Sequence, residues 1–176
     1  IVFGDWSSDV CSSDLTSVFS VVHDFQSTLP QPVLLTKEDP RLVEVRKALR
    51  LLGRDEAFAH DVFVTATAKN IDPIMWVANV ECESEVKRTA VSPKGYKGLG
   101  QTPRAQMRSG YDAADLMLAA CIYAEKMRIA KGDERKALQL YKGGNNPAAL
   151  KEAEKVFRLT AKLKTKIQSQ EDIENG

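Results

Sequence analysis

One stretch of the chain combines a carboxylate that can transfer protons with a backbone that can lie against a bulky ligand. Glu83 and Ser84 end a nearly continuous apolar pattern, and a loop with three glycines follows, Gly95, Gly98 and Gly100. A carboxyl group beside apolar side chains holds its proton more readily, which suits it to act as a general acid. Glycine lets the main chain approach a ligand closely. This layout predicts one carboxylate at the mouth of a cleft that receives a polar ligand.

Helical periodicity alone does not identify the acid. Glu83 follows Val80 and Trp76 by about one and two helical turns, so its surroundings can be dry. Glu81 has Val77 at an equivalent offset and fits the same argument. A solvated glutamate at a helix end remains the alternative interpretation of Glu83, and a wider pattern is needed to choose.

Three ordered blocks within residues 71–146 supply that pattern, because their spacing resembles the signature of the lytic transglycosylase domain. This lysozyme-like module cuts the glycan strands of peptidoglycan. The blocks are Glu83–Gln101, Asp112–Tyr123 and Ala137–Gly144. The first block matches at Glu83, Ser84, Ala90, Ser92, Gly95, Gly98, Leu99 and Gln101. The chain departs from the family pattern at Val86, Tyr96, Gly100, Ala120 and Lys142, where an aromatic residue, a small residue, methionine, glycine and asparagine are usual.

The resemblance implies an activity and a role for each matching residue. Glu83 would protonate the leaving oxygen of the glycosidic bond and then act as base toward the C6 hydroxyl of N-acetylmuramic acid, closing a 1,6-anhydro ring. Tyr141 would direct its hydroxyl into the cleft near this acid; otherwise it is an ordinary core aromatic. The predicted substrate-binding residues are Ser84, Tyr96, Gly98, Leu99, Gly100 and Gln101. Their alternative roles are a small helix residue for Ser84, an exposed loop aromatic for Tyr96 and a plain tight turn for the glycines.

A second catalytic carboxylate is not evident in the motif. Most glycosidases use two, but Asp112, Asp115 and Asp133 fall at predicted helix starts, where N-capping explains them better. A site with one carboxylate fits substrate-assisted chemistry, in which the N-acetyl oxygen of the sugar attacks the anomeric carbon. The resemblance to lytic transglycosylases implies this mechanism.

Two other functions stay open. A hydrolase similar to goose-type lysozymes would use water in place of the C6 hydroxyl on the same scaffold. A non-catalytic helical module would bind glycan or only build an assembly, such as a phage virion or a secretion apparatus. The substitutions at Val86, Gly100, Ala120 and Lys142 favour this last function, whereas the combination of Glu83, Gln101 and Tyr141 argues against it.

Composition limits the partners. The net charge of +1 over 176 residues gives no basic bias of the kind that indicates nucleic-acid binding, and no apolar run is long enough to span a bilayer. Peptidoglycan glycan strands are the predicted partner. Cys82 and Cys121 lie in apolar helix patterns and are expected to pack as small hydrophobes. No Cys and His spacing is typical of a metal site, so we predict neither a metal nor a cofactor.

The chain divides into four predicted parts. Residues 1–15 lack any periodicity and resemble the translation of a sequencing adapter, so a signal peptide can be missing. Residues 16–36 form a linker or a truncated remnant, residues 37–167 the lysozyme-like domain, and residues 168–176 a frayed tail. The resemblance implies a location in the cell envelope, the periplasm or outside the cell, or delivery by a phage.

The predicted fold is mostly helical, with a small irregular or hairpin-like loop after the helix that carries Glu83. Apolar periodicity and end signals predict helices over 40–52, 56–69, from 73 onward, 112–127, 133–141 and 147–167. The helix from 73 is apolar nearly all round, which is typical of a central helix. The predicted apolar stripe of the last helix consists of Leu150, Val156, Leu159 and Leu163.

Overall fold

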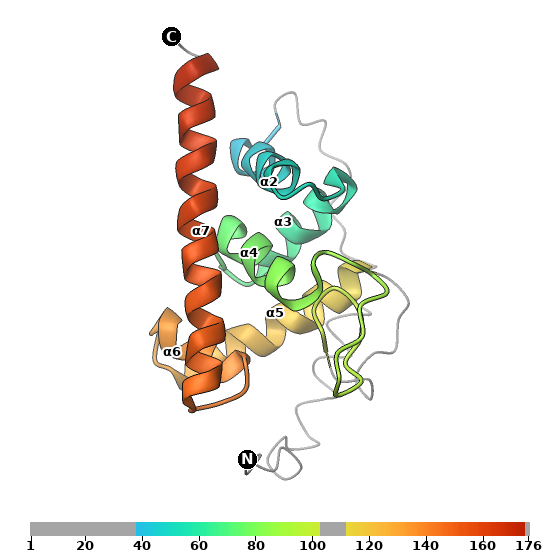
Figure 1. Cartoon of the computed structure of the whole chain (residues 1–176), viewed down its shortest axis with the longest axis vertical. Helices are drawn as coiled ribbons and strands as arrows, with labels where there is room; N and C mark the ends of the chain where they lie inside the picture. Colours follow the sequence, from blue (N-terminus) through green and yellow to red (C-terminus); the bar gives the residue numbers. More distant parts are fainter. Residues whose placement is uncertain (1–37, 103–111, 175–176) are drawn as a thin grey trace. The chain divides into compact units, whose positions relative to one another are not determined.

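The computed structural model describes residues 38–102 and 112–174. The segments expected to be an adapter-derived sequence (1–15) and a linker (16–36) lie outside the described residues. The described part is mostly α-helical, as predicted (Figure 1). Its helices are α2 (Pro40–Leu51), α3 (Ala59–Ala68), α4 (Pro73–Ser84), α5 (Asp112–Ile129), α6 (Glu134–Tyr141) and α7 (Pro147–Glu174), with a short 3-10 helix, η1 (Glu56–Phe58), before α3.

Side-chain caps explain where the helices begin. Asp39, Asp72 and Asp133 each accept a hydrogen bond from a backbone N–H in the first turn of α2, α4 and α6, which satisfies donors that have no partner inside the helix. Asn146 does the same for α7, where its Oδ1 accepts from the N–H of Ala149 at 2.9 Å. The predicted start signals at these positions are therefore confirmed.

Helix α4 forms the centre of the core. Every residue from Ile74 to Val80 is buried, and Trp76 is completely inaccessible. Helices α2, α3 and α7 pack against α4, while α5 packs against α3 and α6. The last turn of α4 leaves the core: Cys82 is exposed and Glu83 is partly exposed. The prediction that Cys82 packs as a small hydrophobe is wrong for this reason, and both it and Cys121 are free thiols.

Helix α7 differs from its prediction in length and in its buried face. It continues through Glu174, so the frayed tail predicted from 168 is wrong; no Gly or Pro interrupts the segment 168–174, and Glu171 forms an ion pair with Lys47 of α2 at 3.4 Å. Leu150 is 38% exposed and does not belong to the stripe. The buried face is a regular series at spacings of three and four residues, Ala149, Ala153, Val156, Thr160, Leu163 and Ile167.

The segment after α4 is an irregular loop. Two isolated antiparallel bridges, Val91 with Lys97 and Lys97 with Thr102, connect its parts. The described residues contain no strand, and the hairpin-like form stays a prediction. Leu99 is fully buried and fixes this loop to the helical core.

Candidate active site around Glu83

Glu83 lies in the last turn of α4, at the place where this helix reaches the surface. Its side chain is 20% exposed, and its Oε1 accepts a hydrogen bond from the ammonium of Lys142 at 2.8 Å. Lys142 caps the C-terminus of α6, and only 6% of its side chain is exposed. The ion pair therefore joins α4 to α6 across 59 residues of sequence. Among the described residues, this is the one ion pair that Glu83 makes.

Tyr141 approaches the same place from the end of α6. Its hydroxyl donates a hydrogen bond to the carbonyl oxygen of Gly100 at 3.3 Å. Its ring packs edge-on against Trp76 and Tyr123, with ring centroids 6.4 and 6.0 Å away. Burial, followed by the negative charge of Glu83, raises the pKa of Tyr141 well above its usual value, so this hydroxyl is a neutral hydrogen-bond donor. Glu83, Tyr141 and the backbone of Gly100 thus come together.

Asp115 anchors the glycine loop instead of capping α5. Its carboxylate is buried and accepts from the N–H of Gly100 at 3.0 Å and from the hydroxyl of Thr102 at 2.9 Å. The capping role predicted for Asp115 is wrong, and Asp112 forms an ion pair with Arg88. Sequence reasoning missed the anchor because it depends on a contact between α5 and a loop of irregular structure.

Gly100 is required by packing. A Cβ atom built at this position would lie 2.5 Å from the Cβ of Ala119 and 3.3 Å from the carbonyl oxygen of Asp115, both on α5. The helix therefore occupies the space of any side chain at residue 100.

Several predicted substrate-binding side chains are used inside the fold. The Gln101 amide nitrogen donates to the carbonyl oxygens of Gly98 at 2.8 Å and of Ala90 at 3.2 Å, and this residue is 9% exposed. The Ser84 hydroxyl donates to the Val80 carbonyl at 3.1 Å. These contacts hold the loop and the helix end, which is the structural role named as the alternative for Ser84.

Within the same loop, Tyr96 is exposed and Gly98 is buried. Tyr96 is 36% exposed and can present its ring to a ligand. Gly98 has φ +80°, a conformation that favours glycine, and its N–H donates to the carbonyl oxygen of Ala90. The position of Tyr96 agrees with both of its predicted roles, a sugar-stacking surface and an exposed loop aromatic.

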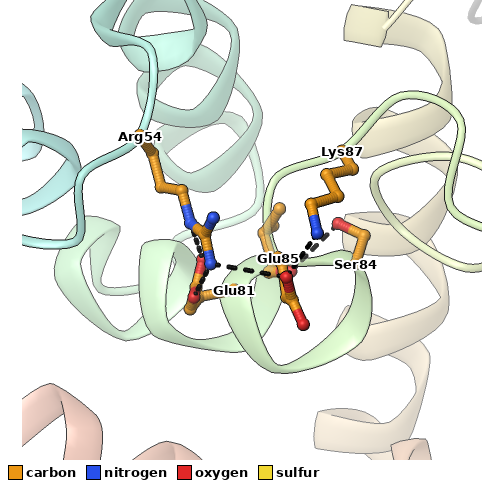
Figure 2. Close-up of polar contacts among 6 residues, drawn as sticks. Arg54, Glu81, Ser84, Glu85 and Lys87 are labelled. Carbon is orange, nitrogen blue, oxygen red and sulfur yellow. Dashed lines mark hydrogen bonds and ion pairs between the residues drawn. The ribbon is translucent and has the colours of Figure 1, made fainter.

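The neighbouring carboxylates are engaged elsewhere (Figure 2). Arg54 donates two hydrogen bonds to Glu81, at 2.8 and 2.6 Å, and lies 3.7 Å from Glu85. Lys87 also pairs with Glu85, and its hydrogen bond lowers the pKa of that carboxyl. The bidentate pair occupies both oxygens of Glu81. Of the two candidates that periodicity left open, Glu83 is the one whose negative charge raises the pKa of Tyr141.

The chain turns sharply directly after α4. Glu85 and Val86 have φ +52° and +53°, in the left-handed region that β-branched residues rarely adopt. Val86 is nevertheless buried, so its packing stabilises the turn. Strained backbone of this kind persists where the surrounding structure holds it, and it is frequent next to functional sites.

The sequence patterns did not predict that Asn79 and Lys142 belong to the site. Asn79 is completely buried beside Tyr141, and no partner among the described residues forms a well-aligned hydrogen bond with its amide nitrogen or its amide oxygen. It is the one polar residue within 74–80, a signal that was available in the sequence. Lys142 stands in the sequence pattern only as a departure from asparagine, and the pattern does not indicate its partner.

Two hollows of the described surface lie away from Glu83. One is lined by Lys69, Met75 and Tyr123 among others, and a second by Arg41, Pro73 and Lys164 among others. Neither is lined by Glu83, so the cleft at this residue stays a prediction. Within 38–102 and 112–174, no group of three or more His, Cys, Asp and Glu side chains is placed to hold a metal ion.

Two further observations concern the chain as a whole. None of the helices in the described ranges is both long enough and apolar enough to cross a membrane. Comparison of the chain with models of protein families, with curated proteins and with solved structures gave no match. The function must therefore be inferred from the residues themselves.

Proposed function

We propose that this chain is a peptidoglycan lytic transglycosylase with a lysozyme-like fold, in which Glu83 is the only catalytic carboxylate. The observation that carries the proposal is the convergence of Glu83, Tyr141 and Gly100, which come from three separate parts of the chain. Glu83 and Tyr141 match the sequence signature, and Gly100 lies within its first block at a position that departs from the pattern. Glu83 lies at the end of α4, Tyr141 at the end of α6, and Gly100 in the loop between α4 and α5.

In the proposed reaction, Glu83 protonates the oxygen that links N-acetylmuramic acid to N-acetylglucosamine. The N-acetyl oxygen of the substrate attacks the anomeric carbon, and Glu83 then removes the proton of the C6 hydroxyl, which closes the 1,6-anhydro ring. Tyr141, as a neutral hydroxyl next to Glu83, can donate a hydrogen bond to the reacting sugar. A cell-envelope, periplasmic or extracellular location, or delivery by a phage, follows from this substrate.

The ion pair between Glu83 and Lys142 favours a second candidate, a non-catalytic module that binds glycan. One oxygen of Glu83 is occupied by the ammonium of Lys142 at 2.8 Å, whereas a general acid must present its carboxyl group to the substrate. In a binding module, the same pair would fix the end of α4 to α6 and serve stability alone.

Digestion of purified sacculi separates these functions. The parent chain, Glu83→Gln and Glu81→Gln are compared by the loss of turbidity, and the soluble products are identified by mass spectrometry. We expect anhydro-muropeptides from the parent and from Glu81→Gln, because Glu81 is engaged by Arg54, and none from Glu83→Gln. Reducing ends would indicate a hydrolase. Equal clearing by Glu83→Gln would refute the role of this acid, and binding without any clearing would identify the non-catalytic module.

A further inference from the structure

The proposed reaction does not explain which group balances the charge of Lys142 when Glu83 acts as an acid. Lys142 is almost completely buried, and Glu83 is its ion-pair partner among the described residues. If Glu83 takes up a proton while this contact persists, the buried ammonium loses its counter-charge. Leaving a buried charge without a partner is strongly unfavourable. Another anion at Lys142 would let the ammonium keep a counter-charge while Glu83 acts as the acid.

The other charged and titratable groups around the pair do not supply that anion. Tyr141 of α6 is neutral because its pKa is raised, and Asp115 of α5 is engaged by the N–H of Gly100 and by Thr102. Cys82 is exposed as a residue, but partial desolvation raises the pKa of its thiol, which stays neutral. Glu81 is held by Arg54. The missing partner must come from the ligand.

The loop next to the pair is suited to an anionic ligand. Residues 86–102 contain four basic side chains, Lys87, Arg88, Lys94 and Lys97, and no acidic one. Two of the four are paired with carboxylates outside this range, Lys87 with Glu85 and Arg88 with Asp112. Lys94 and Lys97 are exposed on either side of Tyr96. A positive loop of this kind attracts a negatively charged polymer toward the end of α4, although the chain as a whole has a net charge of only +1.

We infer that Lys142 determines specificity by selecting a glycan that carries a carboxylate near the sugar bound at Glu83. The inference rests on the proposed binding of glycan at this site. The ligand carboxylate replaces Glu83 as the partner of Lys142, and Glu83 takes one proton from solvent. The charges balance, since the incoming negative charge is matched by the proton, and the ammonium keeps one counter-ion throughout. Binding of the correct substrate thus prepares the acid.

Two groups of peptidoglycan can supply the carboxylate. One is the lactyl group of muramic acid, which is a free carboxylate in strands without stem peptides and an amide in strands that carry them. The other is a carboxylate of the stem peptide itself. A neutral oligosaccharide of N-acetylglucosamine has the same backbone and neither group, and it serves as the uncharged control.

Isothermal titration calorimetry in buffers of different ionisation enthalpy measures the protons taken up on binding. The full chain is titrated with short peptide-free strands, peptide-bearing strands and the neutral oligosaccharide, and the same titrations are made with Lys142→Met, Lys142→Arg and Glu83→Gln. We expect the parent to take up close to one proton with at least one of the two acidic ligands and none with the neutral one. The arm that shows the uptake identifies the source of the carboxylate.

The variants separate this inference from a structural role of the pair. Lys142→Met should lose the preference for the acidic ligand, by about tenfold or more in affinity, whereas Lys142→Arg should keep it. Glu83→Gln should bind the acidic ligand without proton uptake. Equal affinity for charged and neutral strands, no uptake in the parent, or no binding of any acidic strand would overturn the inference. If a proton is taken up but no anhydro ends form, the inference about Lys142 stands and the lyase function is refuted instead.

Discussion

Replacement of Gly100 by alanine tests the packing of the glycine loop against α5. The new Cβ would lie 2.5 Å from the Cβ of Ala119, about 1 Å closer than an ordinary van der Waals contact allows. Relief of this overlap moves the loop away from the helix, which costs about 1–3 kcal/mol for overpacking. The shift also weakens the hydrogen bond from the Gly100 N–H to the buried carboxylate of Asp115, worth about 1.5–3 kcal/mol. We expect a total loss of about 2–4 kcal/mol in the free energy of unfolding.

A second substitution shows whether the overlap is the cause. Ala119→Gly removes the colliding atom and costs about 1 kcal/mol by itself, because glycine is unfavourable inside a helix. In the double variant the overlap is absent, so its stability should exceed the sum of the single effects by about 1–3 kcal/mol. Urea unfolding followed by circular dichroism gives all four free energies.

Gly53→Ala is the matched control for backbone strain. Gly53 has φ +68°, and a Cβ atom added there would have no other atom within 4 Å, so alanine should cost only about 1–2 kcal/mol through its left-handed conformation. Additive effects of Gly100→Ala and Ala119→Gly, or a Gly100→Ala variant as stable as the parent, would refute the proposed contact. Lytic activity should fall in the single Gly100 variant and recover in the double variant.

Three further predictions concern the site, one helix cap and the core. Tyr141→Phe removes one weak hydrogen bond and keeps the aromatic packing, so it should lower stability by about 1 kcal/mol or less while the rate of sacculus lysis falls at least about tenfold; an unchanged rate would exclude a role in the reaction. Burial alone would raise the pKa of Asp72, but hydrogen bonds from Lys164 and from two N–H groups of α4 lower it, so its carboxylate stabilises the fold at neutral pH. Asp72→Asn keeps the cap but should lower the free energy of unfolding at neutral pH by about 1 kcal/mol or less, after allowance for solvent screening. This difference from the parent should disappear as the pH falls below about 4. Urea unfolding at several pH values measures it, and a difference that persists in acid would contradict this reasoning. Val156→Ala should lower the free energy of unfolding by about 1.5–3 kcal/mol, because Val156 is buried, and Leu150→Ala should lower it clearly less, because Leu150 is exposed. The reverse order in urea unfolding would show that the buried stripe of α7 is assigned wrongly.

Local signals were sufficient to predict most of the fold. The Asp-Pro pairs at the starts of α2 and α4 and the Asn-Pro pair at the start of α7 are short-range patterns, and each begins a helix in the structure. The end of α7 was misplaced because nothing in 168–174 stops a helix, and an apolar stripe alone does not show how far it continues. Leu150 was misassigned because Ala149, a less conspicuous residue, takes the buried position beside it.

The site could be predicted only in part, because its decisive contacts join distant segments. The signature predicts Glu83 and Tyr141 as site residues, but the effect of one on the other is a tertiary property. The roles of Asp115 as an anchor and of Lys142 as the partner of Glu83 depend on how α5 and α6 pack. No periodicity within one helix contains that information.

Cleavage of purified sacculi in water enriched with oxygen-18 tests the central claim most directly. If Glu83 acts as the only catalytic carboxylate of a lyase, mass spectrometry should find 1,6-anhydro ends without the heavy isotope from the parent chain, and no product from Glu83→Gln. Reducing ends that carry oxygen-18, or the same anhydro products from Glu83→Gln, would contradict this account.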